Sequence, residues 1–186
     1  QLYPKVTYYD ESYTILVWED HRNSAEFGDI YYQFLDASGN EILDPQGVPA
    51  CLDTANQIKP RVKASYDGAF IVWEDYRNGA YPEVDIFIQH LNSNNQFSFE
   101  DNGLLVNAEN SISPVMKKDG FGGVYTAWDD YRIGSNSIYM QRVNPANGIV
   151  YEENGKKIFA GITGNVGDPD TDTHAKSVTV DNEKTL

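Results

Sequence analysis

Three tryptophans in matching sequence contexts constrain the fold of this chain more than any other feature. Trp18, Trp73 and Trp128 stand 55 residues apart on both occasions. Each is followed by an acidic residue, an aspartate, a tyrosine or histidine, and an arginine. Because similarity at a fixed period is the signature of a repeat architecture, the chain is predicted to consist of tandem units.

The similarity extends to both sides of the tryptophan. Downstream, each unit has an Ile-aromatic-x-Gln segment, which ends at Gln33, Gln89 and Gln141. Upstream, each unit opens near a proline, which is Pro4, Pro60 or Pro114. These landmarks place the units at residues 4–59, 60–113 and 114–168, and the start of a fourth unit at 169–186.

Within a unit, the pattern predicts four short strands. In the second unit they are segments 61–65, 70–73, 85–91 and 104–106. The dipeptide before the last segment is Asn-Gly, which supplies the positive φ angles of a tight turn. No stretch has a capped helical period of 3.6 residues, so the chain is predicted to be all-β.

Four antiparallel strands in about 55 residues match one blade of a β-propeller. An immunoglobulin-type sandwich needs about 100 residues per unit, and solenoid coils are usually shorter. In a propeller, one aromatic per blade at a fixed spacing packs each sheet on its neighbour. The predicted fold is therefore a β-propeller, with residues 1–186 forming one partial ring.

The number of units leaves this ring open. Closed propellers typically have about four to eight blades, and an open arc leaves apolar faces exposed. We therefore expect the arc to be closed by remaining blades of a longer protein, by a second copy of the chain or by another chain. The first of these is favoured, because the sequence stops inside a fourth unit.

The charged residues of the motif are predicted to be structural, because a catalytic group is needed once per site and these recur in every unit. They are Asp20, Arg22, Asp75, Arg77, Asp130 and Arg132. Each aspartate is expected to accept backbone N–H groups in its turn. Each arginine is expected to pair with a carboxylate such as Asp29 or Asp85, or to stack on an aromatic ring. The repeated glutamines are expected to satisfy backbone groups.

Binding is expected where the units differ, in the loop between the second and third strands. The candidate residues are Phe27, Tyr81 and Glu83, because Phe27 and Tyr81 would offer aromatic faces to a sugar or a peptide. The alternative is that the loop aromatics fold back onto their own blade.

Metal, cofactor and catalytic signals are weak or absent in the sequence. Asp168, Asp170 and Asp172 alternate as in a calcium loop, but the required glycine and glutamate are missing. The single cysteine, Cys51, is expected to be a small packed residue. No nucleophile elbow or phosphate loop is present, so we expect no cofactor beyond a weak calcium candidate and no enzymatic activity.

The charge balance excludes two classes of partner. The chain has 14 Lys and Arg residues and 28 Asp and Glu residues, for a net charge of −14. Nucleic acids and anionic membrane surfaces require a basic patch, so neither is an expected partner. A protein or a glycan is expected instead.

The segment 72–79 with its Asp-Ile-Phe-x-Gln continuation at 85–89 resembles a tandem propeller repeat of secreted and cell-surface bacterial proteins. Such repeats often accompany a type IX secretion sorting domain. The resemblance implies an extracellular or cell-surface module that binds a protein or glycan, or serves as a scaffold. The alternatives are a structural subunit whose arc a partner chain closes, and part of a propeller hydrolase whose active site lies outside this chain.

Overall fold

The computed structural model of the protein describes residues 1–9, 11–79 and 83–159. These residues form strands, turns and loops, and none of them is helical, so the predicted all-β class is confirmed. The expected fourth unit, at 169–186, lies outside the described residues. None of the described residues belongs to a helix long and apolar enough to cross a membrane.

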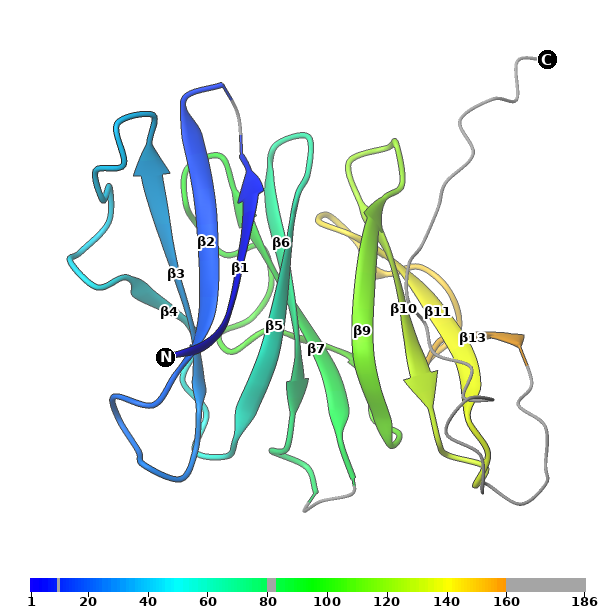
Figure 1. The fold of residues 1–186 in the computed structure, drawn as a ribbon. Helices are drawn as coiled ribbons and strands as arrows, with labels where there is room; N and C mark the ends of the chain where they lie inside the picture. Colours follow the sequence, from blue (N-terminus) through cyan, green and yellow to red (C-terminus); the bar gives the residue numbers. More distant parts are fainter. Residues whose placement is uncertain (10, 80–82, 160–186) are drawn as a thin grey trace, which may run out of the picture.

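The described strands form three antiparallel sheets (Figure 1). The first sheet has the order β1 (Leu2–Tyr8), β2 (Tyr13–Asp20), β3 (Asp29–Asp36) and β4 (Val48–Cys51). The second sheet has the order β5 (Gln57–Ala64), β6 (Gly68–Asp75), β7 (Asp85–Asn92) and β8 (Leu104–Asn107). The third sheet contains β9 (Ser111–Lys118), β10 (Val124–Asp130) and β11 (Ser137–Asn144) in that order, with β12 (Gly148–Ile149) and β13 (Lys156–Phe159) both paired to β11.

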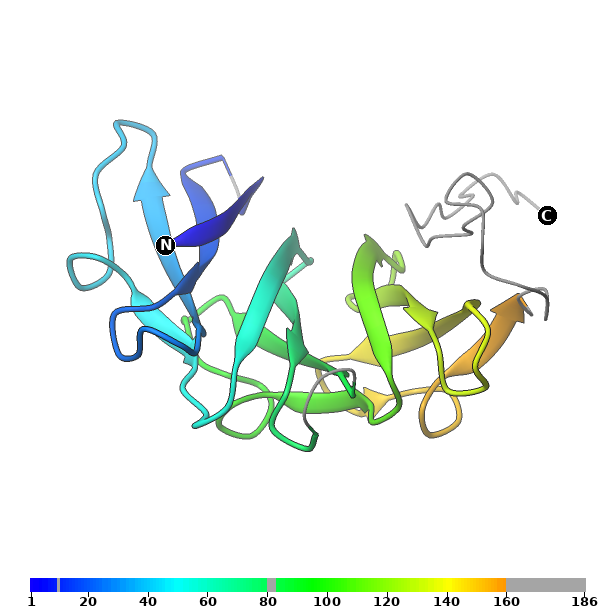
Figure 2. The ribbon, with the colours of Figure 1, turned by 60° about the horizontal axis from the view of Figure 1, so that its bottom comes forward.

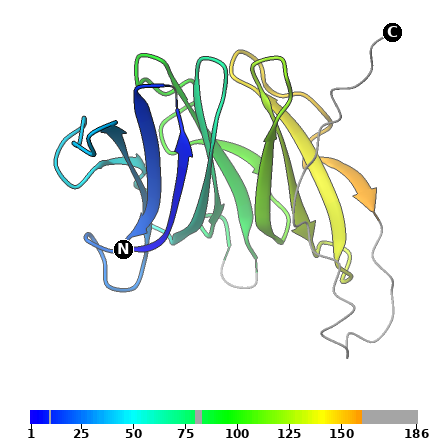
Figure 3. The same cartoon turned by 45° about the horizontal axis from the view of Figure 1, so that its top comes forward.

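The three sheets lie side by side in an arc rather than stacking face to face. Figure 2 shows the first strands, β1, β5 and β9, on the concave side of the arc and the last strands on its convex side. The hairpins that join the first two strands of each sheet lie along one rim (Figure 3). The longer loops between the second and third strands lie on the opposite rim (Figure 1).

The hydrophobic core is divided between the two sheet-to-sheet contacts. Trp73 packs against residues of the first sheet such as Val17 and Ile30. Trp128 packs in the same way against residues of the second sheet such as Val72 and Ile88. Both indoles are completely buried, which confirms that these two tryptophans pack their sheets on the preceding neighbour.

The first strand of each sheet begins before the proline that was expected to mark the start of the unit. β5 begins three residues before Pro60, and β9 begins three residues before Pro114. The residue before each proline has a positive φ, 51° at Lys59 and 58° at Ser113, and the register of pairing shifts at this point. Proline is tolerated here because these are edge strands, in which an N–H group can be lost without breaking a ladder bond.

Candidate functional site

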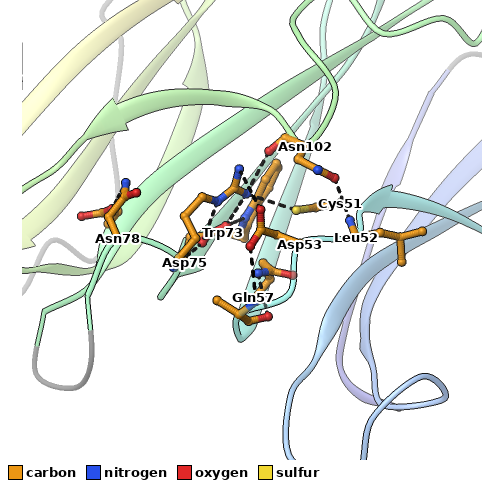
Figure 4. Close-up of polar contacts among 11 residues, drawn as sticks. Cys51, Leu52, Asp53, Gln57, Trp73, Asp75, Asn78 and Asn102 are labelled. Carbon is orange, nitrogen blue, oxygen red and sulfur yellow. Dashed lines mark hydrogen bonds and ion pairs between the residues drawn. The ribbon is translucent and has the colours of Figure 1, made fainter.

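The Trp-acidic-Asp-aromatic-Arg motif folds into one compact polar cluster in each sheet. In the second sheet, Asp75 accepts hydrogen bonds from Trp73 Nε1 at 2.8 Å and from the backbone N–H of Arg77 at 2.9 Å. The Arg77 guanidinium binds both carboxylate oxygens, at 2.9 and 2.6 Å (Figure 4). Asp75 is fully buried, so these donors replace all of its solvation.

The third sheet makes the same contacts, and the first sheet makes them except that the Arg22 guanidinium binds only one carboxylate oxygen. Asp20 accepts from Trp18 Nε1 at 2.7 Å and from the Arg22 guanidinium at 2.6 Å. Asp130 accepts from Trp128 and Arg132 in the same way. Burial by itself would raise the pKa of Asp20, but the hydrogen bonds from Arg22 and Trp18 outweigh burial and hold that pKa well below its usual range.

The structure corrects one expected pairing of the motif arginines. Asp29 and Asp85 were expected to bind them, and that expectation is wrong: these carboxylates accept hydrogen bonds from Asn23 and Asn78 instead. The expected aromatic stacking is confirmed. The guanidinium carbons of the three arginines lie 3.8–4.1 Å from ring centroids on the third strand, Arg22 over Tyr31, Arg77 over Phe87 and Arg132 over Tyr139.

The repeated glutamines satisfy backbone groups, as predicted. Gln89 donates to the carbonyl of Glu100 at 2.9 Å and accepts the N–H groups of His90 and Phe99. Gln33 and Gln141 make the equivalent three bonds in their own sheets. Each amide thus ties the third strand to the loop that follows it.

Sequence reasoning missed the role of the acidic residue directly after the tryptophan. Glu19 accepts the backbone N–H of Lys59 in the next sheet at 3.1 Å. Glu74 accepts the N–H of Ser113 at 2.9 Å and binds Lys59 Nζ at 2.9 Å. These carboxylates therefore join neighbouring sheets across the concave side. The signal was an acidic residue at the same position in all three motifs.

The concave surface carries the candidate functional site. It consists of β1, β5 and β9, which are the first strands of the three sheets and face a shared centre in Figure 2. The basic residues of these strands are Lys5, Lys59, Arg61, Lys63, Lys117 and Lys118, and the strands contain no acidic residue. These side chains do not stand out in the sequence, because binding was expected in the variable loops and these residues lie on the repeated strands.

Two of the three loop residues predicted to bind a ligand are among the described residues. Phe27 is 46% exposed in the loop between β2 and β3, and Glu83 is exposed in the loop between β6 and β7. Tyr81 lies outside the described residues. Their binding role stays a prediction.

The calcium candidate at Asp168, Asp170 and Asp172 also lies outside the described residues and stays a prediction. Within the part of the chain that the structure describes, no group of three or more His, Cys, Asp and Glu side chains is arranged to hold a metal ion.

The outer face of the first sheet has no neighbour among the described residues. A cavity of about 350 Å³ opens on this face, and Trp18 and Leu16 line it. Trp18 is 8% exposed, whereas the equivalent Trp73 and Trp128 are fully covered by a preceding sheet. On the same sheet, Val6 is 65% exposed. The face therefore resembles the buried contact faces of the other two sheets.

Comparison with known proteins gives likenesses of structure only. No protein-family model matches the chain, and no curated protein matches it. Among solved structures, the chain is similar to a thermostable family-43 glycoside hydrolase, with TM-score 0.49 and 12% identity over 87% of this chain and 54% of that one. It is similar to an α-L-arabinofuranosidase from Lactobacillus brevis, with TM-score 0.50 and 11% identity over 85% and 54%. An endo-arabinase from Bacteroides thetaiotaomicron matches with TM-score 0.47 and 13% identity over 86% and 63%.

These findings correct the expectation that the protein is not an enzyme. That expectation is contradicted by the likeness in fold to a solved enzyme, the α-L-arabinofuranosidase. The chain spans about half the length of the first two structures. The specific repeat type and its association with type IX secretion stay predictions. With its three antiparallel sheets in an arc, the chain has the fold of a partial β-propeller.

Proposed function

We propose that this chain is part of a β-propeller glycoside hydrolase and forms one side of a carbohydrate-binding channel. The observation that carries the proposal is the concave surface of β1, β5 and β9. In a closed ring of blades, these strands would line the central channel. Support for the hydrolase class comes from the fold likeness to an α-L-arabinofuranosidase.

The chemistry of the proposed reaction requires two carboxyl groups, one as acid and one as base or nucleophile. The described first strands supply neither. Glu19 and Glu74 lie behind these strands, but both are buried and already bind backbone N–H groups of the next blade. The proposal therefore assigns the acid and the second carboxylate to blades outside the described residues. The present blades would bind and orient the saccharide.

The open face of the first blade supports a larger ring. Trp18, Leu16 and Val6 occupy positions that are buried by a preceding blade elsewhere in the chain. A further blade of the same protein is the proposed occupant, because the chain spans about half the length of the hydrolases that it resembles. A second copy or another chain would appear as a complex in size measurements by light scattering.

The proposed substrate suggests where the protein works. Polysaccharides of cell walls and matrices lie outside cells, so an extracellular or cell-surface location forms part of the proposal. Secretion through the type IX pathway would be compatible with this location and rests on the sequence resemblance.

The test combines binding with hydrolysis. Calorimetric titration of the 186-residue chain with a panel of neutral and acidic oligosaccharides should detect binding of at least one. The protein that contains the complete ring of blades should release reducing ends from the same glycan. A complete ring that neither binds nor cleaves any member of the panel would overturn the proposal.

A further inference from the structure

The charge of the concave surface is opposite to that of the rest of the chain. The three first strands hold six of the chain's 14 basic residues and none of its 28 acidic residues. Everything outside these strands therefore has eight basic and 28 acidic residues, a net charge of −20. A scattered distribution of charges would not leave one concave surface purely basic.

Most of these cations are available for a ligand. Lys59 forms an ion pair with Glu74, with 2.9 Å between Nζ and Oε2. The other five form no ion pair with any described residue; they are Lys5, Arg61, Lys63, Lys117 and Lys118. Lys63 is half-buried and Lys117, which occupies the equivalent position of the next blade, is exposed.

The nearest carboxylates of the adjoining rim do not neutralise the surface. Asp119, which directly follows β9, is buried and bound by the Arg142 guanidinium at 2.6 Å. Asp67, in the hairpin after β5, is exposed and lies 3.5 Å from Nε2 of the buried His90, so it adds one negative charge beside the six cations. Acidic groups on the convex side are screened, because the Debye length is about 8 Å at physiological ionic strength. A concave surface of one charge sign also concentrates the field at its centre.

A small cavity at one end of this surface adds an aromatic group to the cations. It has a volume of about 160 Å³ and lies between the hairpins of the second and third blades. Lys118 and Tyr66 line it, and Tyr66 is 95% exposed. An exposed tyrosine presents an apolar ring face and a polar hydroxyl, which together suit the face and edge of a sugar ring. A lysine beside it supplies a point charge for an anionic substituent.

We propose that the concave surface binds an anionic saccharide, whose carboxylate or sulfate groups pair with the lysines of β5 and β9. This inference rests on the proposed function and names its substrate class. One anionic group pairs with Lys118, beside which the sugar ring lies against Tyr66. Further anionic groups along the saccharide pair with Lys63 and Lys117. Nucleic acid fits less well, because its closely spaced phosphates would also meet the acidic rims of a chain with net charge −14.

Titration calorimetry on the 186-residue chain tests this proposal. The probes are a galacturonate trisaccharide, a chondroitin sulfate oligosaccharide, a neutral arabinotriose and a short single-stranded oligonucleotide. We expect at least one acidic sugar to bind more tightly than arabinotriose. The acidic sugar with the higher affinity then shows whether the site prefers a carboxylate or a sulfate. Affinity should fall when salt is raised from about 50 to about 300 mM. Equal affinity for acidic and neutral sugars, or tighter binding of the oligonucleotide, would overturn the proposal.

Two matched variants distinguish an effect of the concave surface on affinity from an effect of the net charge of the protein. Lys63→Gln with Lys117→Gln should weaken binding of the acidic sugar roughly tenfold, since each removed ion pair contributes up to about 1 kcal/mol. The control is Lys156→Gln with Lys157→Gln, which removes the same charge from exposed residues of β13 on the convex side. The control should keep its affinity within about twofold. Equal loss in both variants would show that only net charge matters.

Two outcomes distinguish this inference from the proposed function. In the first, the complete ring binds an acidic sugar in a charge-dependent way and cleaves no glycan. That result would support the anionic binding surface and contradict the hydrolase proposal. Cleavage of neutral arabinan, with no effect of Lys63→Gln and Lys117→Gln on binding or rate, would leave the hydrolase standing and remove the anionic substrate.

Discussion

The Glu74 carboxylate of the second blade accepts a hydrogen bond from the backbone N–H of Ser113 in the third blade, at 2.9 Å. Ser113 has φ 58°, a left-handed conformation that costs a non-glycine residue roughly 1–2 kcal/mol. Glu19 makes the same bond to Lys59, whose φ is 51°. The carboxylate after each of these tryptophans thus holds the strained residue of the next blade in place.

Substitution of this carboxylate tests its role in joining blades. Glu74→Ala should lower the free energy of unfolding by about 2–3 kcal/mol, because it leaves the Ser113 N–H and the Lys59 ammonium without their buried partner. Glu74→Gln keeps an acceptor oxygen and should cost less. Urea denaturation measures both. A Glu74→Ala protein as stable as the parent would contradict the proposal that this carboxylate joins the second and third blades.

The turn glycine above each tryptophan gives a second prediction. A Cβ at Gly103 would lie 2.5 Å from Cη2 of Trp73, and its φ is +90°. Gly103→Ala should therefore cost about 3 kcal/mol of stability, through both overpacking and backbone strain. Gly39 has φ +82°, and a Cβ added there would meet no atom within 4 Å. Gly39→Ala is therefore the matched control and should cost only about 1 kcal/mol. Equal losses in thermal melts would exclude a packing role for Gly103.

Cys51 offers a chemical test of the blade contact. Burial raises the pKa of its thiol to about 12, and the side chain is 1% exposed. At about pH 8 the native thiol should react with a disulfide reagent roughly a thousandfold more slowly than in guanidinium chloride, where its pKa is ordinary. Absorbance of the released thiolate follows the reaction. Rapid labelling of the native protein would show that the contact between the first two blades opens readily.

His90 predicts a pH dependence of stability. Its ring is fully buried between Ser65 Oγ at 3.1 Å and Ser98 Oγ at 2.7 Å, and burial lowers its pKa below 6.5. The unfolded chain therefore binds the proton more readily than the folded one. The stability that the neutral ring contributes is complete above about pH 6.5 and declines as the pH falls toward the folded pKa.

The difference between the parent and His90→Gln isolates this contribution. Between about pH 7.5 and 5.5, the parent should lose more stability than the variant, by up to about 1 kcal/mol, because about one pH unit of this range lies below the unfolded pKa. Because Asp29 and Asp85 have pKa values raised by burial and shift in the opposite sense, the comparison must be made between proteins at each pH. Parallel curves for the two proteins would rule out this role of His90.

The sequence predicted the fold better than it predicted the site. The strand pattern was sufficient for the all-β class. The spacing of Trp18, Trp73 and Trp128 was sufficient for the packing of one sheet on the next, because nearest-neighbour burial recurs with the repeat. The pairing of Arg77 was predicted wrongly, since sequence alone does not choose between Asp75 and Asp85, and only Asp75 binds its guanidinium at hydrogen-bonding distance. The repeat predicts the first strand of each unit, but it does not show that the lysines of these strands lie on one surface.

The sequence by itself determined the strands, the turns and the tryptophan-bearing face of each blade, since these depend on local periodicity and on contacts that repeat at a fixed interval. Only the tertiary structure decided that Lys5, Lys63 and Lys117 share one concave surface, and that Glu19 and Glu74 clamp the neighbouring blade. The physical reason is that charge acts through distance in space. Residues far apart in the chain create one electrostatic surface once the arc brings their strands together.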